Sequence, residues 1–177
     1  MKREGPATLS EGSRRAVARW LFISLTGFAW TNEADAQSAQ ACPLMTAVLH
    51  EAHADIGALQ KKLGPEFREV VTQERTLDDV AAFEVHTIHY PNQSRLAWRR
   101  IREQGGLVLV DEIRLRSTGI RLANGIAVGD SEEVVKKMLG PPWKTTSSEL
   151  VYACDTVLLK IALDARRVAS IRWQFSF

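Results

Sequence analysis

The sequence predicts an α+β protein made of two duplicated repeats, each a helix plus an antiparallel sheet, with the helices packed on one face of the sheet. Two similar segments indicate the duplication: DIGALQKKLGPEF at residues 55–67 and SEEVVKKMLGPPW at residues 131–143. Each has an N-cap residue, an amphipathic stretch, a glycine and a proline that end the helix, and an aromatic residue two positions on. Alternating apolar and polar residues after each segment predict strands.

The first repeat, residues 37–118, begins with a long predicted helix. Apolar residues at steps of three and four form one stripe from about residue 44 to residue 62. Gly64-Pro65 ends this helix, and a polar loop leads to alternating segments that predict three antiparallel strands. These strands are expected at residues 83–90, 95–101 and 107–117.

The second repeat, residues 119–177, follows the same plan with shorter connections. A helix is predicted at residues 132–139, and strands are predicted at residues 149–154, 157–163 and 168–177. The longer connections of the first repeat are compatible with duplication, because the cost of closing a loop grows only logarithmically with its length.

Residues 1–36 have the three parts of an export signal peptide. Lys and Arg residues up to Arg19 form a basic segment, residues 20–30 form an apolar run too short to span a bilayer, and Ala34-Asp35-Ala36 has the small-x-small form of a cleavage site. We therefore expect cleavage after Ala36 and a periplasmic or secreted protein. The pair Arg14-Arg15 leaves both Sec and twin-arginine export open.

Both cysteines follow the predicted cleavage site. An exported protein lies where thiols are oxidised, so we predict a disulfide between Cys42 and Cys154, with two separate buried thiols as the alternative. Lipidation of Cys42 is a further alternative, because Ala39-Gln40-Ala41 is a second small-x-small sequence. A lipobox normally has Leu followed by a small residue where this chain has Ala39 and Gln40, which favours an unlipidated protein.

Charge and hydropathy exclude two classes of partner. The 177-residue chain has a formal net charge of +2. A nearly neutral protein lacks the basic excess that drives nucleic-acid binding through counterion release. No stretch after the predicted signal peptide is apolar enough for a transmembrane helix, so we expect neither a nucleic-acid partner nor a membrane span.

The four histidines form two pairs, at residues 50 and 53 and at residues 86 and 89. His50 and His53 share one flank of the predicted helix, whereas His86 and His89 point to opposite faces of a strand because their separation is odd. The helical pair is one residue short of the His-Glu-x-x-His signature of metalloproteases. We therefore predict no metal site, and a metal-binding or hydrolytic protein using the His50 and His53 flank remains the alternative.

The sequence contains no pattern typical of a catalytic nucleophile. No nucleophile elbow is present, and Cys154 lies in the middle of a predicted strand, where a disulfide or core thiol fits better than a reactive one. We therefore expect a non-enzymatic protein without a cofactor. A small-ligand carrier is a further alternative, in which Tyr90, Trp143 and Tyr152 would line an apolar crevice between the repeats.

Alternation along the predicted strands separates two faces of the sheet. Odd positions are expected to form the core: Leu107, Leu109, Ile113, Leu115, Ile171, Trp173, Phe175 and Phe177. The opposite face is expected to carry the partner-binding residues Trp98, Arg100, Arg114, Arg116, Lys160 and Arg172, beside Leu96. Arg and Trp supply much of the binding energy at protein interfaces, so this pattern favours a protein partner. A solvated polar face is the alternative.

Residues 125–142, with GIAVGDSEEVV at their start and LGPP at their end, precede three predicted strands. This string resembles the module of SmpA/OmlA lipoproteins of bacterial outer-membrane assembly and of the tandem β-lactamase inhibitory proteins. The resemblance covers residues 119–177 well, and the first repeat only through residues 55–67 and its strand pattern. It implies an envelope or secreted protein that binds other proteins through its sheet and has no catalytic residue. The absent lipobox departs from the SmpA/OmlA pattern and favours a periplasmic or secreted protein.

Overall fold

In this computed structural model, the structure describes residues 33–75, 82–101 and 105–176, with side chains described from Gln40 onward. Most of the predicted signal peptide, residues 1–32, lies outside the described residues. The predicted cleavage site falls in the first turn of helix α1 (Glu33–Ala54). Cleavage after Ala36 stays a prediction.

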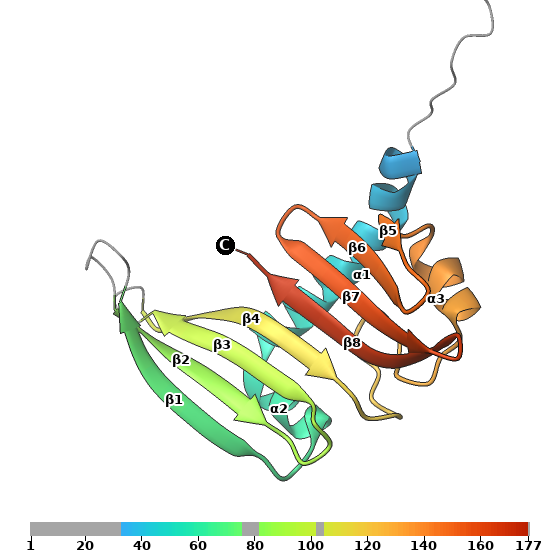
Figure 1. Ribbon diagram of the computed structural model, residues 1–177. Helices are drawn as coiled ribbons and strands as arrows, with labels where there is room; N and C mark the ends of the chain where they lie inside the picture. The colour runs from blue at the N-terminus through green and yellow to red at the C-terminus, as the bar shows by residue number, and fades with distance from the viewer. Residues whose placement is uncertain (1–32, 76–81, 102–104, 177) are drawn as a thin grey trace, which may run out of the picture. The chain divides into compact units, whose positions relative to one another are not determined.

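Eight strands of the described chain form one antiparallel sheet in the order β1-β2-β3-β4-β8-β7-β6-β5 (Figure 1). The two further helices are α2 (Ile56–Leu63) and α3 (Glu132–Leu139). The strands are β1 (Arg68–Arg75), β2 (Ala82–His89), β3 (Arg95–Ile101), β4 (Leu107–Leu115), β5 (Lys144–Thr145), β6 (Glu149–Cys154), β7 (Val157–Asp164) and β8 (Arg167–Phe175). The predicted helix at 132–139 and the six predicted strands are confirmed, with shifts of at most two residues at their ends.

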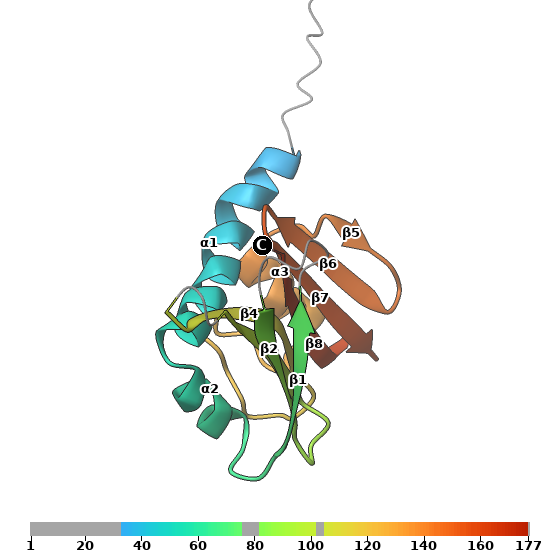
Figure 2. The same ribbon diagram turned by 90° about the vertical axis from the view of Figure 1, so that its left-hand side faces the viewer.

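The helices leave one face of the sheet uncovered. Helix α1 runs behind the strands in Figure 1 and packs against β4, β6 and β7. Figure 2 shows α1 and α2 on the same side of the strands. We call the side that carries the helices the helix side, and the opposite side the open face. The core lies on the helix side, where Met45 and Ala52 of α1 are buried in the same apolar cluster as Leu159 and Trp173 of the sheet.

The predicted fold class, two duplicated helix-plus-sheet repeats, is wrong. Strands β4 and β8 pair directly, so strands assigned to different repeats belong to one continuous eight-stranded sheet. Helix α1 has no counterpart in the second half of the chain. The two similar segments encode short helices with the same local start and stop signals, and local signals do not decide how strands pair. The boundary predicted between residues 118 and 119 falls in the loop between β4 and α3 and stays a prediction.

The long predicted helix at residues 44–62 is in fact two helices. Asp55 has an extended backbone, with φ −156° and ψ 92°, and interrupts the helix between α1 and α2. Its carboxylate accepts a hydrogen bond from the Ala58 N–H at 2.8 Å and caps α2. The apolar stripe continues through the break, because residues of both helices face the same core. The stripe alone therefore could not locate the interruption.

Strand β1 lies where the sequence predicts a polar loop. All eight of its residues are exposed, so it lacks the apolar alternation that identifies a half-buried strand. It pairs with β2 residue for residue from Arg68 opposite His89 to Arg75 opposite Ala82. Backbone pairing, rather than side-chain burial, stabilises this strand at the edge of the sheet.

A β-bulge changes which residues of β4 reach the core. The β3–β4 register shifts between Ala97 and Trp98, which places Trp98 opposite Val110. Val110 is therefore buried, whereas Leu107, predicted to be in the core, is 45% exposed. Five of the other predicted core positions are buried as expected: Ile113, Leu115, Ile171, Trp173 and Phe175. Leu109 is half-buried, and Phe177 lies outside the described residues.

Candidate functional site

Four cationic side chains stand in one row across the open face. Arg95 of β3 pairs with Arg114 of β4, Arg114 pairs with Arg172 of β8, and Arg172 pairs with Lys160 of β7. Directly paired residues of neighbouring antiparallel strands project from the same face. Ile113 and Ile171, next to the row along β4 and β8, are fully buried on the helix side, which places the row on the open face.

Glu112 lies beside this row, two residues from Arg114 on β4. It is only 6% exposed. Its Oε2 accepts hydrogen bonds from Nε and Nη2 of Arg172 at 2.9 and 2.5 Å. Its Oε1 lies 3.4 Å from Nη2 of Arg114 and 3.5 Å from Nη1 of Arg95. We call Arg95, Arg114, Arg172 and Glu112 the arginine cluster; three guanidinium groups share one carboxylate, so the cluster carries excess positive charge.

The arginine cluster is not fully hydrogen-bonded internally. Oε1 of Glu112 and Nε of Arg95 are buried and have no hydrogen-bond partner among the described residues. The side chains of Arg95, Arg114 and Arg172 remain 36, 31 and 34% exposed. Each guanidinium carries five donors in a planar fork that matches a carboxylate, so the cluster can accept a further anionic group from solvent.

A neighbouring ion pair on the open face is balanced, in contrast. Arg99 donates from Nε and Nη2 to Asp111, with N to O distances of 2.5 to 3.0 Å. The guanidinium carbon of Arg99 also lies 5.5 Å from the ring centroid of Phe83. One arginine and one carboxylate neutralise each other here, so this pair adds no excess positive charge to the open face.

The structure places the six predicted partner-binding residues in three different settings. Arg114, Lys160 and Arg172 lie in the row on the open face. Arg116 follows the end of β4, where its Nη1 donates to the Gln93 side chain at 2.9 Å and its backbone N–H to Ser94 Oγ at 3.1 Å.

Trp98 and Arg100 project from the helix side instead. Trp98 is 4% exposed and stacks on His86, with ring centroids 3.7 Å apart and planes 4° apart. The Arg100 guanidinium lies 5.2 Å from the Trp98 ring centroid. Trp98 and Arg114 lie on different faces because Leu96 pairs with Ile113 and Arg95 with Arg114. In this register, Trp98 projects from the helix side with Leu96, and Arg114 projects from the open face with Arg95.

Sequence reasoning missed Arg95 and Glu112, the two residues that complete the arginine cluster. Arg95 is the first residue of β3, and its place beside Arg114 depends on strand register. Glu112 resembles any polar residue of a half-exposed strand until its neighbours are known. The two consecutive acidic residues, Asp111 and Glu112, are the local sign of the bulge.

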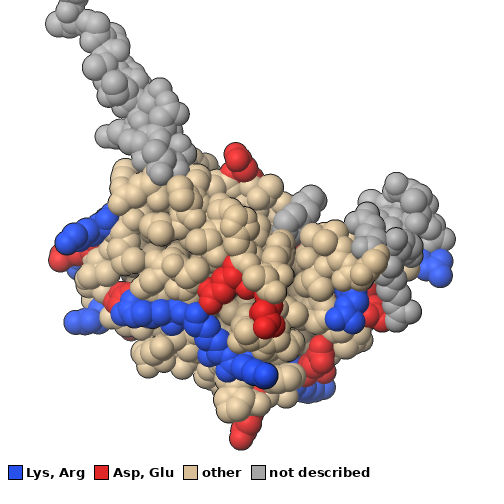
Figure 3. Space-filling view, turned by 180° about the vertical axis from the view of Figure 1, so that it is seen from behind, with Lys and Arg blue, Asp and Glu red and all other residues tan. Residues whose placement is uncertain are grey.

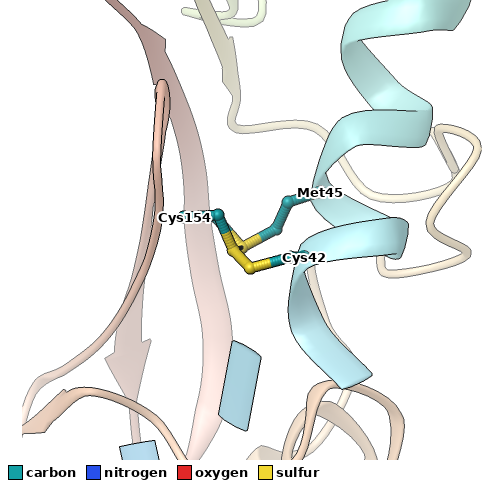
Figure 4. The surroundings of a disulfide bond; sticks show 3 residues. All are labelled: Cys42, Met45 and Cys154. Carbon is teal, nitrogen blue, oxygen red and sulfur yellow. Dashed lines mark hydrogen bonds between the residues drawn. A yellow bond between two sulfur atoms is a disulfide. The ribbon is translucent and has the colours of Figure 1, made fainter. Parts of the chain in front are cut away.

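The predicted disulfide between Cys42 and Cys154 is confirmed. The two Cα atoms are 5.5 Å apart and the sulfur atoms 2.02 Å apart. Figure 4 shows the bond linking α1 to β6, with Met45 one turn further along α1. The Met45 Sδ lies 3.6 Å from the Cys154 Sγ. The disulfide therefore fixes the first helix to the half of the sheet farthest from it in sequence.

The histidines make separate interactions. His53 Nε2 accepts a hydrogen bond from the Val110 N–H at 3.4 Å, and burial, with a smaller effect of His50, lowers the pKa of His53. His86 Nδ1 lies 2.7 Å from the Glu69 carboxylate. Within the described ranges, no three His, Cys, Asp or Glu side chains are grouped closely enough to hold a metal ion.

The three aromatic residues of the suggested crevice lie in different settings. Tyr90 and Tyr152 are buried and donate from their hydroxyl groups to the carbonyls of Gln60 and Gly140, both at 3.2 Å. Each tyrosine therefore anchors the end of a different short helix, α2 or α3. Trp143 is 63% exposed.

The helix side carries charges of both signs. Figure 3 shows Lys and Arg side chains there next to Asp and Glu side chains. Ion pairs join residues of the helices: Lys62 of α2 lies 2.5 Å from Glu51 of α1, and Lys136 lies 2.5 Å from Glu132 within α3. The candidate site is therefore the arginine cluster with Lys160, on the open face.

No helix in the described part of the chain is long and apolar enough to cross a membrane. Comparisons with protein-family models, curated proteins and solved structures found no match to this chain.

Proposed function

We propose that this chain is an exported, non-enzymatic protein-binding module, acting as an envelope adaptor or an inhibitor, and that it binds its partner through the open face of the sheet. The observation that carries the proposal is the row of Arg95, Arg114, Arg172 and Lys160, whose three arginines share the buried carboxylate of Glu112. The partner is an envelope or secreted protein that presents carboxylate side chains to this row.

The physical chemistry of the row supports an acidic protein partner. Three guanidinium groups held close together repel one another, and Glu112 compensates only part of this repulsion. An incoming carboxylate reduces the repulsion and forms charge-assisted hydrogen bonds with the unused donors. The four side chains of the row project from four neighbouring, hydrogen-bonded strands. Their backbone is already ordered before binding, so a partner that docks here costs this chain little backbone entropy.

Export is supported by the disulfide and by the predicted signal peptide. Disulfides persist mainly in oxidising compartments, and the bond between Cys42 and Cys154 joins distant parts of the chain. The resemblance of residues 119–177 to SmpA/OmlA and β-lactamase inhibitory modules supports the same class of function, since those proteins act by binding other proteins.

The experiment is an affinity capture from envelope extract of the source cells, followed by calorimetry with the purified captured protein. The test variant is Arg114→Gln with Lys160→Gln, which leaves Arg172 and Arg95 to compensate Glu112. The control variant is Lys137→Gln with Arg166→Gln, which removes the same charge from two exposed residues near α3.

The proposal expects native and control proteins to bind equally and the test variant to bind at least about tenfold more weakly, since each desolvated charge pair at an interface adds substantially to affinity. It also expects binding to weaken with rising salt. Capture of no partner by the native protein, or equal binding by all three proteins, would overturn the proposal.

A further inference from the structure

We propose that β1 is a self-association edge, through which two copies of this chain pair antiparallel with Val71 opposite Val71 of the second copy. This inference concerns a different surface from the arginine cluster. It does not depend on the proposed function.

The two edges of the sheet differ in how much backbone they expose. Strand β5 at one edge has two residues, which gives a second chain little to pair with. Strand β1 at the other edge has eight exposed residues, pairs with β2 on one side, and contains neither a proline nor a shift in register. Proteins normally blunt such an edge by shortening, bulging or covering it, because its free N–H and C=O groups can pair with another chain.

Apolar exposure at this edge is concentrated near the middle of the strand. Val70 is 38% exposed and Val71 is 49% exposed, on opposite faces of β1. Burying both valines against a second strand removes apolar surface from water on each side of the sheet.

The order of residues in β1 selects one antiparallel register with itself. In a two-fold pair of identical strands, residues opposite each other must have numbers of the same parity, because they either both direct their N–H and C=O groups at the partner strand or both direct them away from it. Centring the pair on Val71 places Arg68 opposite Glu74, and the two-fold axis repeats that pair. The same register places Val70 opposite Thr72.

The neighbouring registers are less favourable. Centring the pair on Thr72 places Glu69 opposite Arg75, but it also sets Val70 against Glu74 and Val71 against Gln73. Centring it on Val70 sets Val71 against Glu69. Only the Val71 register pairs opposite charges and also keeps both valines beside an apolar side chain or a threonine methyl group.

Arg68 and Glu74 are available for this pairing. Both are exposed, and neither side chain forms a hydrogen bond or an ion pair with another residue in the described part of the chain. The second copy is therefore favoured over an unrelated strand, because β1 already presents the charges that complement its own sequence.

Charge reversal tests this register. The full chain with its disulfide intact is studied by sedimentation velocity over a concentration series, as native protein and as Glu74→Arg, Arg68→Glu and the double variant. Each single variant places like charges opposite each other twice, so the dimer is expected to weaken at least about tenfold, equivalent to ~1.4 kcal/mol. The double variant restores opposite charges and is expected to recover the native affinity. Lys144→Glu in β5, at the other edge, should leave the affinity unchanged.

A native protein that stays monomeric throughout the series would overturn the inference. A dimer that either single variant leaves unchanged, or that the double variant fails to restore, would also overturn it. An equally strong dimer after Val71→Lys would place the interface elsewhere and overturn it as well. Since none of these variants alters the arginine cluster, failure here is distinguishable from failure of the proposed function.

Discussion

At the scale of single residues, Glu112 controls the charge balance of the open face. Its side chain is buried beneath arginines that are themselves about one-third exposed. Without this carboxylate, three guanidinium groups would converge with no compensating charge. Glu112 therefore holds the arginines together and leaves the arginine cluster with a net positive charge.

Glu112→Gln is expected to lower the free energy of unfolding by about 2 kcal/mol, because it leaves three partly buried guanidinium groups without their counter-charge. The value lies below that for a fully buried ion pair because water reaches the arginines. Asp111→Asn on the same strand is the control and should cost less than about 1 kcal/mol, since the side chain of Asp111 is 26% exposed and that of Glu112 only 8%. Urea denaturation measures both, and an equal loss for the two variants would contradict this account.

The chain's two tyrosines, Tyr90 and Tyr152, are expected to resist ionisation in the folded protein. Burial raises the pKa of Tyr90 to about 12 from an ordinary value of 10.0. Burial, and to a lesser extent the charge of Glu132, also raises the pKa of Tyr152. The folded state therefore keeps phenolic protons that the unfolded state releases, so stability falls as the pH rises above about 10, towards about 12.

Ultraviolet absorbance of tyrosinate measures this effect. The folded protein should show little tyrosinate at about pH 11, and denaturant at the same pH should release the signal of both tyrosines. Tyr90→Phe should reduce the loss of stability over this pH range. Ionisation of either tyrosine near pH 10 in the folded protein would contradict the prediction.

At the scale of elements, the disulfide and the helix packing perform the same task. Helix α1 packs on β4, β6 and β7, and Cys42 fixes it to β6. The cross-link joins residues 112 positions apart, so it removes many conformations from the unfolded chain. Its contribution adds to that of the apolar packing between α1 and the sheet.

Cys42→Ala with Cys154→Ala is expected to lower the free energy of unfolding by about 2 to 4 kcal/mol, mainly by relaxing the unfolded state. Guanidinium denaturation measures this loss, and reduction of the native protein with dithiothreitol should reproduce it. The helical content by circular dichroism should remain, because apolar contacts still hold α1 on the sheet. A loss below about 0.5 kcal/mol would contradict the prediction.

At the scale of the whole molecule, the described part of the chain is expected to unfold in one step. Strands β4 and β8 join over the four pairs from Glu112 opposite Gln174 to Leu115 opposite Ile171. Helix α1 contacts strands on both sides of that junction. Because the apolar cluster is shared across the junction, neither half of the sheet can keep its core when the other half unfolds.

Tryptophan fluorescence and far-ultraviolet circular dichroism are expected to give coincident denaturation curves. Trp98 and Trp173 are buried in β3 and β8, on the two sides of the junction, so fluorescence reports on both halves. Two separate transitions would show that the halves fold independently and would contradict a shared core.

The sequence by itself determined the features that depend on near neighbours along the chain. The alternation of apolar and polar residues predicted six of the strands. The N-cap residue Ser131 and the helix-ending Gly140-Pro141 predicted the bounds of α3. The disulfide was predicted from the presence of two cysteines in a chain that is expected to be exported. Hydrogen bonds between residues a few positions apart define caps and turns, so a sequence records them directly.

Tertiary structure alone decided register, the union of the strands into one sheet, and the composition of the arginine cluster. Sequence parity put Trp98 and Arg114 on one face, but the register in which β3 pairs with β4 sets them on opposite sides. Only the pairing of β3 with β4 shows that Arg95 and Glu112 belong to the arginine cluster. Only the pairing of β1 with β2 shows that residues 68–75 form a strand. Backbone pairing joins residues far apart in the chain, and a shift of one position reverses every side chain, so no local pattern specifies it.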